Sequence, residues 1–152
     1  MSDAPANIPA SPVGRPVIGV GVVVWKDGRV LLIERATSPM RGQWSLPGGR
    51  QKPGETVTTT ARRELQEETG VTVGPLRLVD VVDFIDRDDN GNLDFHYTLI
   101  DYTARWQGGP ARAGDDAAAV KWADARHLDG YDLWAETRRV IEKSRVVMDD
   151  RG

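Results

Sequence analysis

The chain has 152 residues, of which 39% are hydrophobic and 28% charged, and its formal net charge is −3. A chain of this length suits one domain with one core. The slightly negative charge argues against binding of long nucleic acid, which needs a basic surface. The absence of cysteine excludes disulfides, thiol catalysis and cysteine-type zinc sites.

The N-terminal residues 1–16 are rich in proline, alanine and serine, which predicts a flexible arm. One folded domain is expected at 17–148 and a short tail at 149–152. Residues 1–16 lack the apolar segment of a secretory signal peptide. No apolar run of the chain reaches the roughly 18 residues that a membrane-spanning helix needs. We therefore expect no membrane partner and a cytoplasmic location.

A β-hairpin is predicted at 17–36, because Asp27-Gly28 separates two β-branched runs and favours a tight turn. A helix is predicted from the N-cap Thr56 to Thr69. The other predicted elements are a short strand within 43–49, strands at 76–86, 93–106 and 119–122, a loop at 112–118 and a final helix at 133–147. This pattern predicts an α+β domain with a mixed sheet between helices.

The segment between the two long strands begins like a calcium-binding loop. Its twelfth position is Tyr97, however, where such a loop needs a glutamate. Strand patterns flank it on both sides. We therefore predict a plain hairpin with Asn90-Gly91 at its tip.

Three glutamates of the first helix share one face. Glu64, Glu67 and Glu68 stand at i, i+3 and i+4, and such positions are neighbours on an α-helix. Ala61 and Leu65 form an adjacent apolar stripe that is expected to dock on the sheet, with the acidic face beside it. The ordinary interpretation of such a cluster is a solvated helix surface.

Like charges at this spacing destabilise a helix by a few tenths of a kcal/mol per pair unless a cation offsets them. Arg62 and Arg63 are expected to offset part of this cost. A divalent ion offsets more, because clustered carboxylate oxygens suit Mg²⁺ or Mn²⁺. The glycines of the preceding "PGGRQKPGE" allow the backbone to approach such an ion or a ligand closely.

The spacing of these residues supplies a family resemblance. Gly49, Glu55 and the run "RELQEETGV" from Arg63 to Val71 fit G-x5-E-x7-R-E-U-x-E-E-x-G-U at every fixed position, where U is apolar. This pattern is the Nudix box, and the chain resembles Nudix hydrolases from about Val17 to Val147. The resemblance implies an α/β/α sandwich with a mixed sheet and the Nudix loop–helix–loop.

The resemblance also implies an activity, namely hydrolysis of a nucleoside diphosphate linked to another moiety with Mg²⁺ or Mn²⁺. The metal ligands that it implies are the Gly48 carbonyl, Glu55, Glu64, Glu67 and Glu68. Glu55 is also a candidate for an indirect role behind these ligands, and Glu64 for orienting the attacking water. Arg63 is expected to pair with the carboxylates and keep them oriented and ionised.

The catalytic base is expected outside the box, in the loop "AGDDAAAVKW". Asp116 is the favoured residue, and Asp115 and Glu64 are the alternatives. The same loop also fits a simple turn with a capping aspartate.

Four residues near the predicted mouth of the site are candidates for substrate binding, namely Arg35, Arg41, Trp44 and Arg50. The arginines could equally be surface charges, and Trp44 a core residue. The overall pattern resembles small bacterial ADP-ribose pyrophosphatases and mutator-type hydrolases. A nucleotide sugar such as ADP-ribose is the first expected substrate, and a (deoxy)nucleoside triphosphate, including an oxidised one, is the second. A non-catalytic nucleotide sensor and a homodimer remain open.

Overall fold

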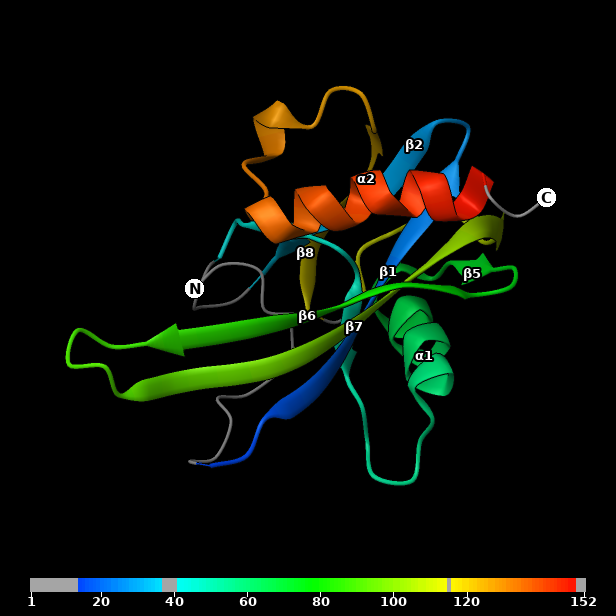
Figure 1. Cartoon of the computed structure of the whole chain (residues 1–152). Helices are drawn as coiled ribbons and strands as arrows, with labels where there is room; N and C mark the ends of the chain where they lie inside the picture. Colours follow the sequence, from blue (N-terminus) through cyan, green and yellow to red (C-terminus); the bar gives the residue numbers. More distant parts are fainter. Residues whose placement is uncertain (1–13, 37–40, 115, 150–152) are drawn as a thin grey trace.

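The computed structural model describes residues 14–36, 41–114 and 116–149, which form a mixed β-sheet with one α-helix on each side (Figure 1). The strands are β1 (Val17–Lys26), β2 (Arg29–Arg35), β3 (Trp44–Ser45), β4 (Gly48–Arg50), β5 (Thr72–Val73), β6 (Arg77–Arg87), β7 (Leu93–Gly108) and β8 (Ala117–Asp124). The helices are α1 (Val57–Thr69) and α2 (Ala135–Asp149), and a 3₁₀ turn occupies Asp129–Tyr131. The predicted α+β sandwich is confirmed.

Strand β1 lies at the centre of the sheet. It runs parallel to β7, with Val17 opposite Tyr97 and Trp25 opposite Arg105. It runs antiparallel to β2 and to the short β4. Beyond these, β8 and β3 pair with β2, and β6 and β5 pair with β7. The sheet is therefore mixed, and the glycine-rich strand β4 is attached directly to its central strand.

The predicted hairpin at the start of the domain is confirmed. Asp27 and Gly28 have φ angles of 52° and 77°, and Lys26 pairs with Arg29 across the turn. Positive φ at both central residues is the geometry that matches the twist of the flanking strands.

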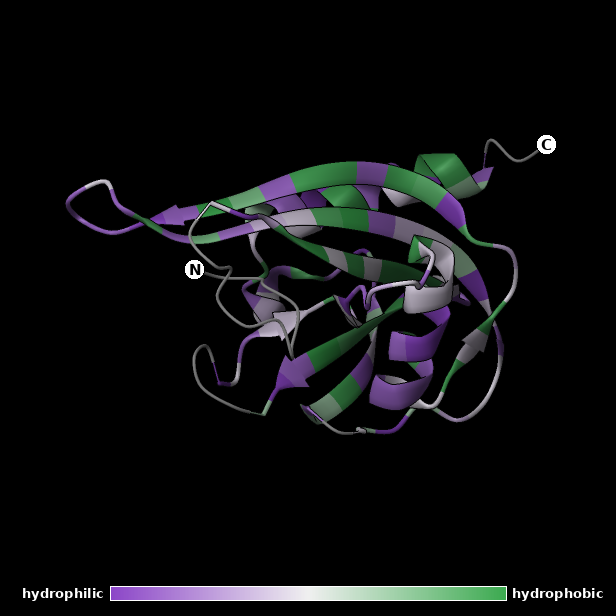
Figure 2. Cartoon of the chain, turned by 90° about the horizontal axis from the view of Figure 1, so that it is seen from below, coloured by the Kyte–Doolittle hydropathy of each residue, from purple (hydrophilic) through white to green (hydrophobic). Residues whose placement is uncertain are grey.

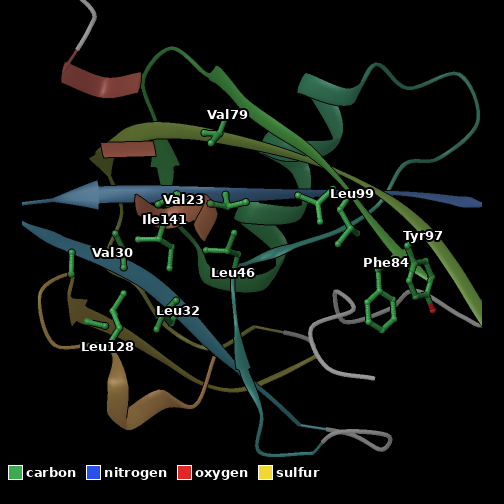
Figure 3. Packing of buried hydrophobic residues seen from close by; sticks show 14 residues of the cluster. Val23, Val30, Leu32, Leu46, Val79, Phe84, Tyr97, Leu99, Leu128 and Ile141 are labelled. Atoms are coloured by element: carbon green, nitrogen blue, oxygen red, sulfur yellow. The ribbon is translucent and has the colours of Figure 1, made fainter. Parts of the chain in front are cut away.

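The two faces of the sheet carry separate cores. Val20, Val22 and Val24 of β1 pack with Ala61 and Leu65 of α1. The core on the other face includes Val23, Val30, Leu32 and Ile141, the last of these from α2 (Figure 3). Alternate residues of one strand point to opposite faces, so β1 is apolar on both sides because both faces are covered.

Two predicted elements differ from the structure at their ends. The final helix begins at Ala135, two residues later than expected, because Leu133 and Trp134 pack on the core ahead of it. It ends at Asp149, inside the predicted tail 149–152. Strand β8 covers Ala117–Asp124 because it pairs with β2 along the whole length of that strand. Residues 1–13 of the predicted arm lie outside the described residues.

The predicted hairpin between the long strands is also confirmed. The Asp88 carboxylate accepts hydrogen bonds from the amides of Asn90 and Asn92, and Gly91 has a φ angle of 84°. The tip is hydrophilic and projects beyond the rest of the molecule (Figure 2). Neither helix of the described chain is long and apolar enough to cross a membrane.

Candidate active site

Helix α1 starts and ends where the sequence predicts. The Thr56 hydroxyl accepts a hydrogen bond of 3.2 Å from the amide of Thr59, which caps the N-terminus. Gly70 ends the helix in the left-handed region with a φ angle of 74°, and its amide bonds to the Gln66 carbonyl. These two caps fix which residues of α1 face the sheet.

The acidic face of α1 is divided between core and solvent. Leu65 of the predicted docking stripe is 1% exposed, as expected, but Glu64 and Glu68 are also buried, at 4% and 3%. The side chain of Glu67, by contrast, is 43% exposed. Two of the three carboxylates therefore lie as deep as the apolar stripe, and only Glu67 lies beside it as predicted.

Arg63 joins the carboxylates into one network. Its Nε and Nη2 atoms donate to the two oxygens of Glu55 at 2.6 and 3.0 Å. Its Nη1 atom donates to Glu64 Oε2 and Glu67 Oε1, both at 3.1 Å. Nη2 also donates to the Arg50 carbonyl in the loop before the helix. The bidentate contact is the strongest form of such a pair, so Arg63 fixes both the loop and the helix carboxylates.

The two carboxyls that contact Arg63, those of Glu55 and Glu64, have pKa values shifted in opposite directions. The hydrogen bonds from Arg63, together with the Lys52 amide, lower the pKa of Glu55 to about 2. Burial raises the pKa of Glu64 although Arg63 opposes the rise. Arg62 does not share this task, contrary to our expectation. It donates instead to the carbonyls of Val73 and Gly74, because it projects from the other side of the helix.

Glu68 is the most deeply enclosed member of the cluster. Its Oε1 atom accepts a hydrogen bond of 2.9 Å from the Gly48 amide, whereas its buried Oε2 atom has no hydrogen-bond partner among the described residues. Burial raises the pKa of Glu68 to about 8, with Glu64 and Asp116 adding to the rise and Arg35 opposing it. Asp116 and Arg35 therefore lie within electrostatic reach of this carboxyl.

The glycines of β4 make room for the cluster. A Cβ atom on Gly49 would overlap the Glu64 carboxylate, and one on Gly48 would overlap the Val20 carbonyl of β1. Only glycine lets β4 pair with β1 while α1 presses its carboxylates against it. The predicted close backbone approach thus has a specific cause at both positions.

The cluster has the chemistry of a divalent cation site. An oxygen of a buried carboxylate without a partner is costly, and a hard cation is the partner that oxygen ligands such as Glu68 and Glu64 prefer. Within the ranges that the structure describes, no three His, Asp or Glu side chains already converge around one point. Arg63 occupies Glu64 and Glu67 instead. The carboxylate oxygens fit a divalent metal ion, and the Arg63 guanidinium is the positive charge that keeps Glu64 and Glu67 close together.

Comparison with known proteins decides the family. A family model described as the NUDIX domain matches residues 15–144. The chain belongs to the Nudix family. It is 35% identical over 113 residues to an ADP-ribose pyrophosphatase of Methanocaldococcus jannaschii, covering 74% of this chain and 64% of that protein. It thus spans just under two thirds of that relative.

Two further similarities point in a different direction. The chain is 32% identical over 115 residues to an oxidized purine nucleoside triphosphate hydrolase of Danio rerio, covering 76% of this chain and 70% of the relative. A crystal structure of a MutT NUDIX hydrolase from Burkholderia pseudomallei superposes with a TM-score of 0.73 and 34% identity, covering 85% of this chain and 98% of that one. The chain is therefore a Nudix family member, and two of its relatives are named for different substrates.

Arg35 connects the Nudix carboxylates with aromatic residues of the core on the α2 side. It is 8% exposed, and its charge lowers the pKa of both Glu68 and Tyr97, although burial raises each of them overall. Tyr97 stacks with Phe84 at a centroid distance of 5.8 Å. Phe84 and Tyr97 are themselves buried, at 6% and 1% exposed, so Arg35 links the carboxylate cluster to the core on the α2 side.

Trp44 is half-buried and packs against the core on the α2 side. It lies edge-on to Tyr131 at 5.4 Å, while Trp134 lies edge-on to Phe84 at 5.3 Å. The sequence had not singled out Phe84, Tyr131 or Trp134. Phe84 could have been found, because a hairpin with its tip at Asn90-Gly91 pairs that residue with Tyr97.

The two remaining candidate arginines lie apart from each other. Arg50 lines an open cavity of about 600 Å³ together with Lys52 and Glu55 of the Nudix loop. Arg41 is exposed in a turn between β2 and β3. Arg50 is therefore adjacent to the carboxylate cluster, whereas no described contact links Arg41 to it. Asp115, the alternative base, lies outside the described residues.

Proposed function

We propose that this Nudix protein hydrolyses the pyrophosphate bond of a nucleoside diphosphate linked to a sugar, with ADP-ribose as the first candidate and AMP and ribose 5-phosphate as products. The observation that carries the hydrolytic proposal is the buried, half-unpartnered carboxyl of Glu68 beside Glu64. The name of the archaeal relative, an ADP-ribose pyrophosphatase, favours the sugar-linked substrate.

Glu64, Glu67, Glu68 and the Gly48 carbonyl would hold the metal ions, Mg²⁺ or Mn²⁺. When bound, these ions neutralise the pyrophosphate and lower the pKa of the attacking water. The Arg63 network keeps the glutamates oriented from the loop side. Glu55 has both oxygens engaged by Arg63, which favours its indirect role over that of a direct ligand.

The other residues divide the substrate between them in this proposal. Asp116 takes a proton from the attacking water as general base, since it lies within electrostatic reach of Glu68. Arg35 contacts a phosphate oxygen, because its charge reaches the Glu68 carboxyl. Trp44, which is half-buried beside Tyr131, stacks on the base. Arg50 and Arg41 bind the sugar phosphate, Arg50 from the cavity beside the Nudix loop.

A second substrate class has equal support among the relatives. The zebrafish relative is named an oxidized purine nucleoside triphosphate hydrolase, and stacking on Trp44 would suit an oxidised purine as well as the adenine of ADP-ribose. In that case a triphosphate is cleaved to monophosphate and pyrophosphate. A nucleotide-binding sensor without turnover is the third alternative, and a homodimer is compatible with all of them.

A hydrolysis screen with product identification tests these alternatives. Purified protein is incubated with Mg²⁺ or Mn²⁺ and with ADP-ribose, other nucleotide sugars, and ordinary and oxidised deoxynucleoside triphosphates. We expect AMP and ribose 5-phosphate from ADP-ribose at the highest kcat/KM. Pyrophosphate release from a triphosphate at higher kcat/KM would replace the sugar-linked substrate, and binding without any product would favour the sensor.

A pair of matched variants links the activity to the Nudix helix. Glu67→Gln is expected to lower kcat at least roughly 100-fold, because it weakens a metal ligand. The melting temperature should change little, because the Glu67 side chain is 43% exposed. Glu142→Gln is the control, since Glu142 is an exposed glutamate of α2 that pairs only with Arg145 among the described residues. Near-normal turnover of Glu67→Gln would contradict its metal-binding role.

A further inference from the structure

The loop between β7 and β8 is docked on the C-terminal end of the Nudix helix. The Gly114 amide donates a hydrogen bond of 2.8 Å to the Glu68 carbonyl, and the Arg112 amide donates one of 3.0 Å to the Thr69 carbonyl. The last carbonyls of an α-helix have no partner inside the helix. The loop supplies these partners, and it thereby completes the cap that Gly70 begins.

Gly114 is the point of closest approach in this contact. A Cβ atom built on Gly114 would overlap the carbonyl oxygen of Glu67 and would lie 3.1 Å from that of Glu68. Both neighbours are backbone atoms of a helix, which cannot turn aside as a side chain can. Any other residue at this position would therefore lift the loop away from α1.

The same loop carries Asp116, two residues further on. The Asp116 carbonyl accepts a hydrogen bond of 3.2 Å from the Ala36 amide at the end of β2, and the Gly114 carbonyl accepts one of 3.4 Å from the Ala117 amide. Asp116 thus stands between an anchor on the helix and an anchor on the sheet. The hydrogen bond from Gly114 to the Glu68 carbonyl therefore seats the segment that carries Asp116 on a residue of the carboxylate cluster.

We propose that Gly114 is a positioning residue for hydrolysis, because it lets the loop seat on the α1 carbonyls and so fixes the Asp116 carboxylate relative to Glu68. This inference rests on the proposed function, in which Asp116 accepts a proton from the attacking water. Gly114 itself acts only through Asp116. A displacement of about 1 Å at a catalytic group can cost on the order of a hundredfold in rate, so a single methyl group on Gly114 is a meaningful perturbation.

A double-mutant cycle tests the proposal. The values of kcat and KM are measured for wild type, Gly114→Ala, Asp116→Asn and the double variant. We expect Gly114→Ala to lower kcat roughly 10- to 100-fold with little change in KM, and to cause no further loss when Asp116→Asn is already present. Gly74→Ala is the control, because its Cβ atom would lie at an ordinary 3.9 Å from the Arg105 carbonyl, and it should keep the wild-type kcat.

Two outcomes of the cycle would overturn the proposal. One is a wild-type kcat in Gly114→Ala or in Asp116→Asn. The other is an equal fold-loss on adding Gly114→Ala to wild type and to Asp116→Asn, which would mark a purely structural effect. Thermal unfolding checks that each variant folds. Arg112→Pro, which removes the second amide donor, replaces Gly114→Ala in the cycle if that variant does not fold.

Amide hydrogen exchange separates this proposal from the proposed function. In the folded wild-type protein, the amides of Gly114 and Arg112 should exchange slowly because both are bonded to helix carbonyls. Fast exchange of both would overturn the docking, whatever the activity. If wild type hydrolyses no nucleotide in the screen, the proposed function fails first, and slow exchange would then show that the docked loop exists without serving hydrolysis.

Discussion

Helices α1 and α2 pack on opposite faces of the same sheet, yet they bury different kinds of residue. The buried face of α2 contains Val140, Ile141 and Met148, and its charged residues lie outside, as in the ion pairs of Arg139 with Glu136 and Asp80. The buried face of α1 instead contains two glutamates, Glu64 and Glu68. Helix α2 thus packs through apolar side chains, whereas α1 buries two carboxyl groups, which lowers the stability of the fold.

The difference between the two helices indicates which of them contains functional residues. Burying a carboxyl raises its pKa and lowers the stability of the fold at neutral pH unless a partner compensates. Arg63 compensates Glu64, but one oxygen of Glu68 has no partner in the described chain. Natural proteins depart from good packing mainly at functional sites. The helix that buries carboxyls is therefore the one in which we expect the functional residues.

The largest effect that would sharpen this contrast is expected from Glu68→Gln. The amide keeps the shape of the side chain and can still accept from the Gly48 amide, but it is a poor metal ligand. We expect hydrolysis to fall at least roughly 100-fold, while the melting temperature stays level or rises because the amide replaces a carboxyl whose ionisation is opposed by burial. Calorimetry and a hydrolysis assay check the two halves. A large loss of stability would show that Glu68 is a structural residue like those of α2.

The reverse pattern is expected from Ile141→Ala on α2. Ile141 is 0% exposed in the core, and truncation of such a residue typically lowers the free energy of unfolding by about 2–5 kcal/mol. The kcat of the molecules that remain folded should change little, because α2 contributes no carboxylate to the cluster. Urea titration combined with kcat measured at low temperature checks this. A collapse of kcat without loss of stability would contradict the contrast between the helices.

A smaller effect concerns the buried carboxyl of Asp101, which lies on the α2 side of the sheet. Burial, together with the nearby charge of Asp80, raises its pKa from 3.8 to about 7. The folded state thus retains a proton that the unfolded chain has released, and stability falls as the pH rises from about 4 to about 7. Asp101→Asn removes this dependence. Between pH 4 and pH 8, we expect its stability relative to wild type to improve by about 4 kcal/mol.

Denaturant titrations at both pH values check this prediction. Asp83→Asn is the matched control, because Asp83 is an exposed aspartate on the neighbouring strand β6, and exposed substitutions usually change stability by less than about 0.5 kcal/mol. Parallel stability–pH curves for wild type and Asp101→Asn would show that burial of Asp101 does not lower the stability at neutral pH. Of the buried carboxyls discussed, only those of α1 would then be destabilising.

The local features of the site were predictable because they lie in one contiguous stretch. The caps Thr56 and Gly70 and the shared face of the glutamates follow from helical geometry alone. The depth of Glu68 did not follow, because it depends on the Gly48 amide of β4, and β4 is held by the central strand. The role of Arg62 was misjudged for the same reason, since its partners come from β5 and the turn after it.

Other parts of the fold were beyond sequence patterns for physical reasons. Strand β5 has two residues, too few for any alternation to be seen. The true extent of β8 depends on its pairing with β2. The aromatic contacts on the α2 side join Trp44 to Tyr131 and Phe84 to Trp134, from distant segments of the chain. Only the hairpin register of Phe84 depends on residues nearby in the sequence. Local periodicity therefore predicts elements, whereas burial and aromatic contacts depend on tertiary pairing.

The parallel pairing of β1 with β7 has a consequence for the order in which the protein forms. Val17 pairs with Tyr97, so the central strand and its neighbour are adjacent in space but far apart in the sequence. Contacts between distant segments form slowly, because a long loop must close first. During synthesis the glycine loop and the Nudix helix emerge well before β7. Until then, the valines of β1 lack the strand beside which they are buried. The sheet on which the carboxylate helix packs is complete only after the second half of the chain has been synthesised.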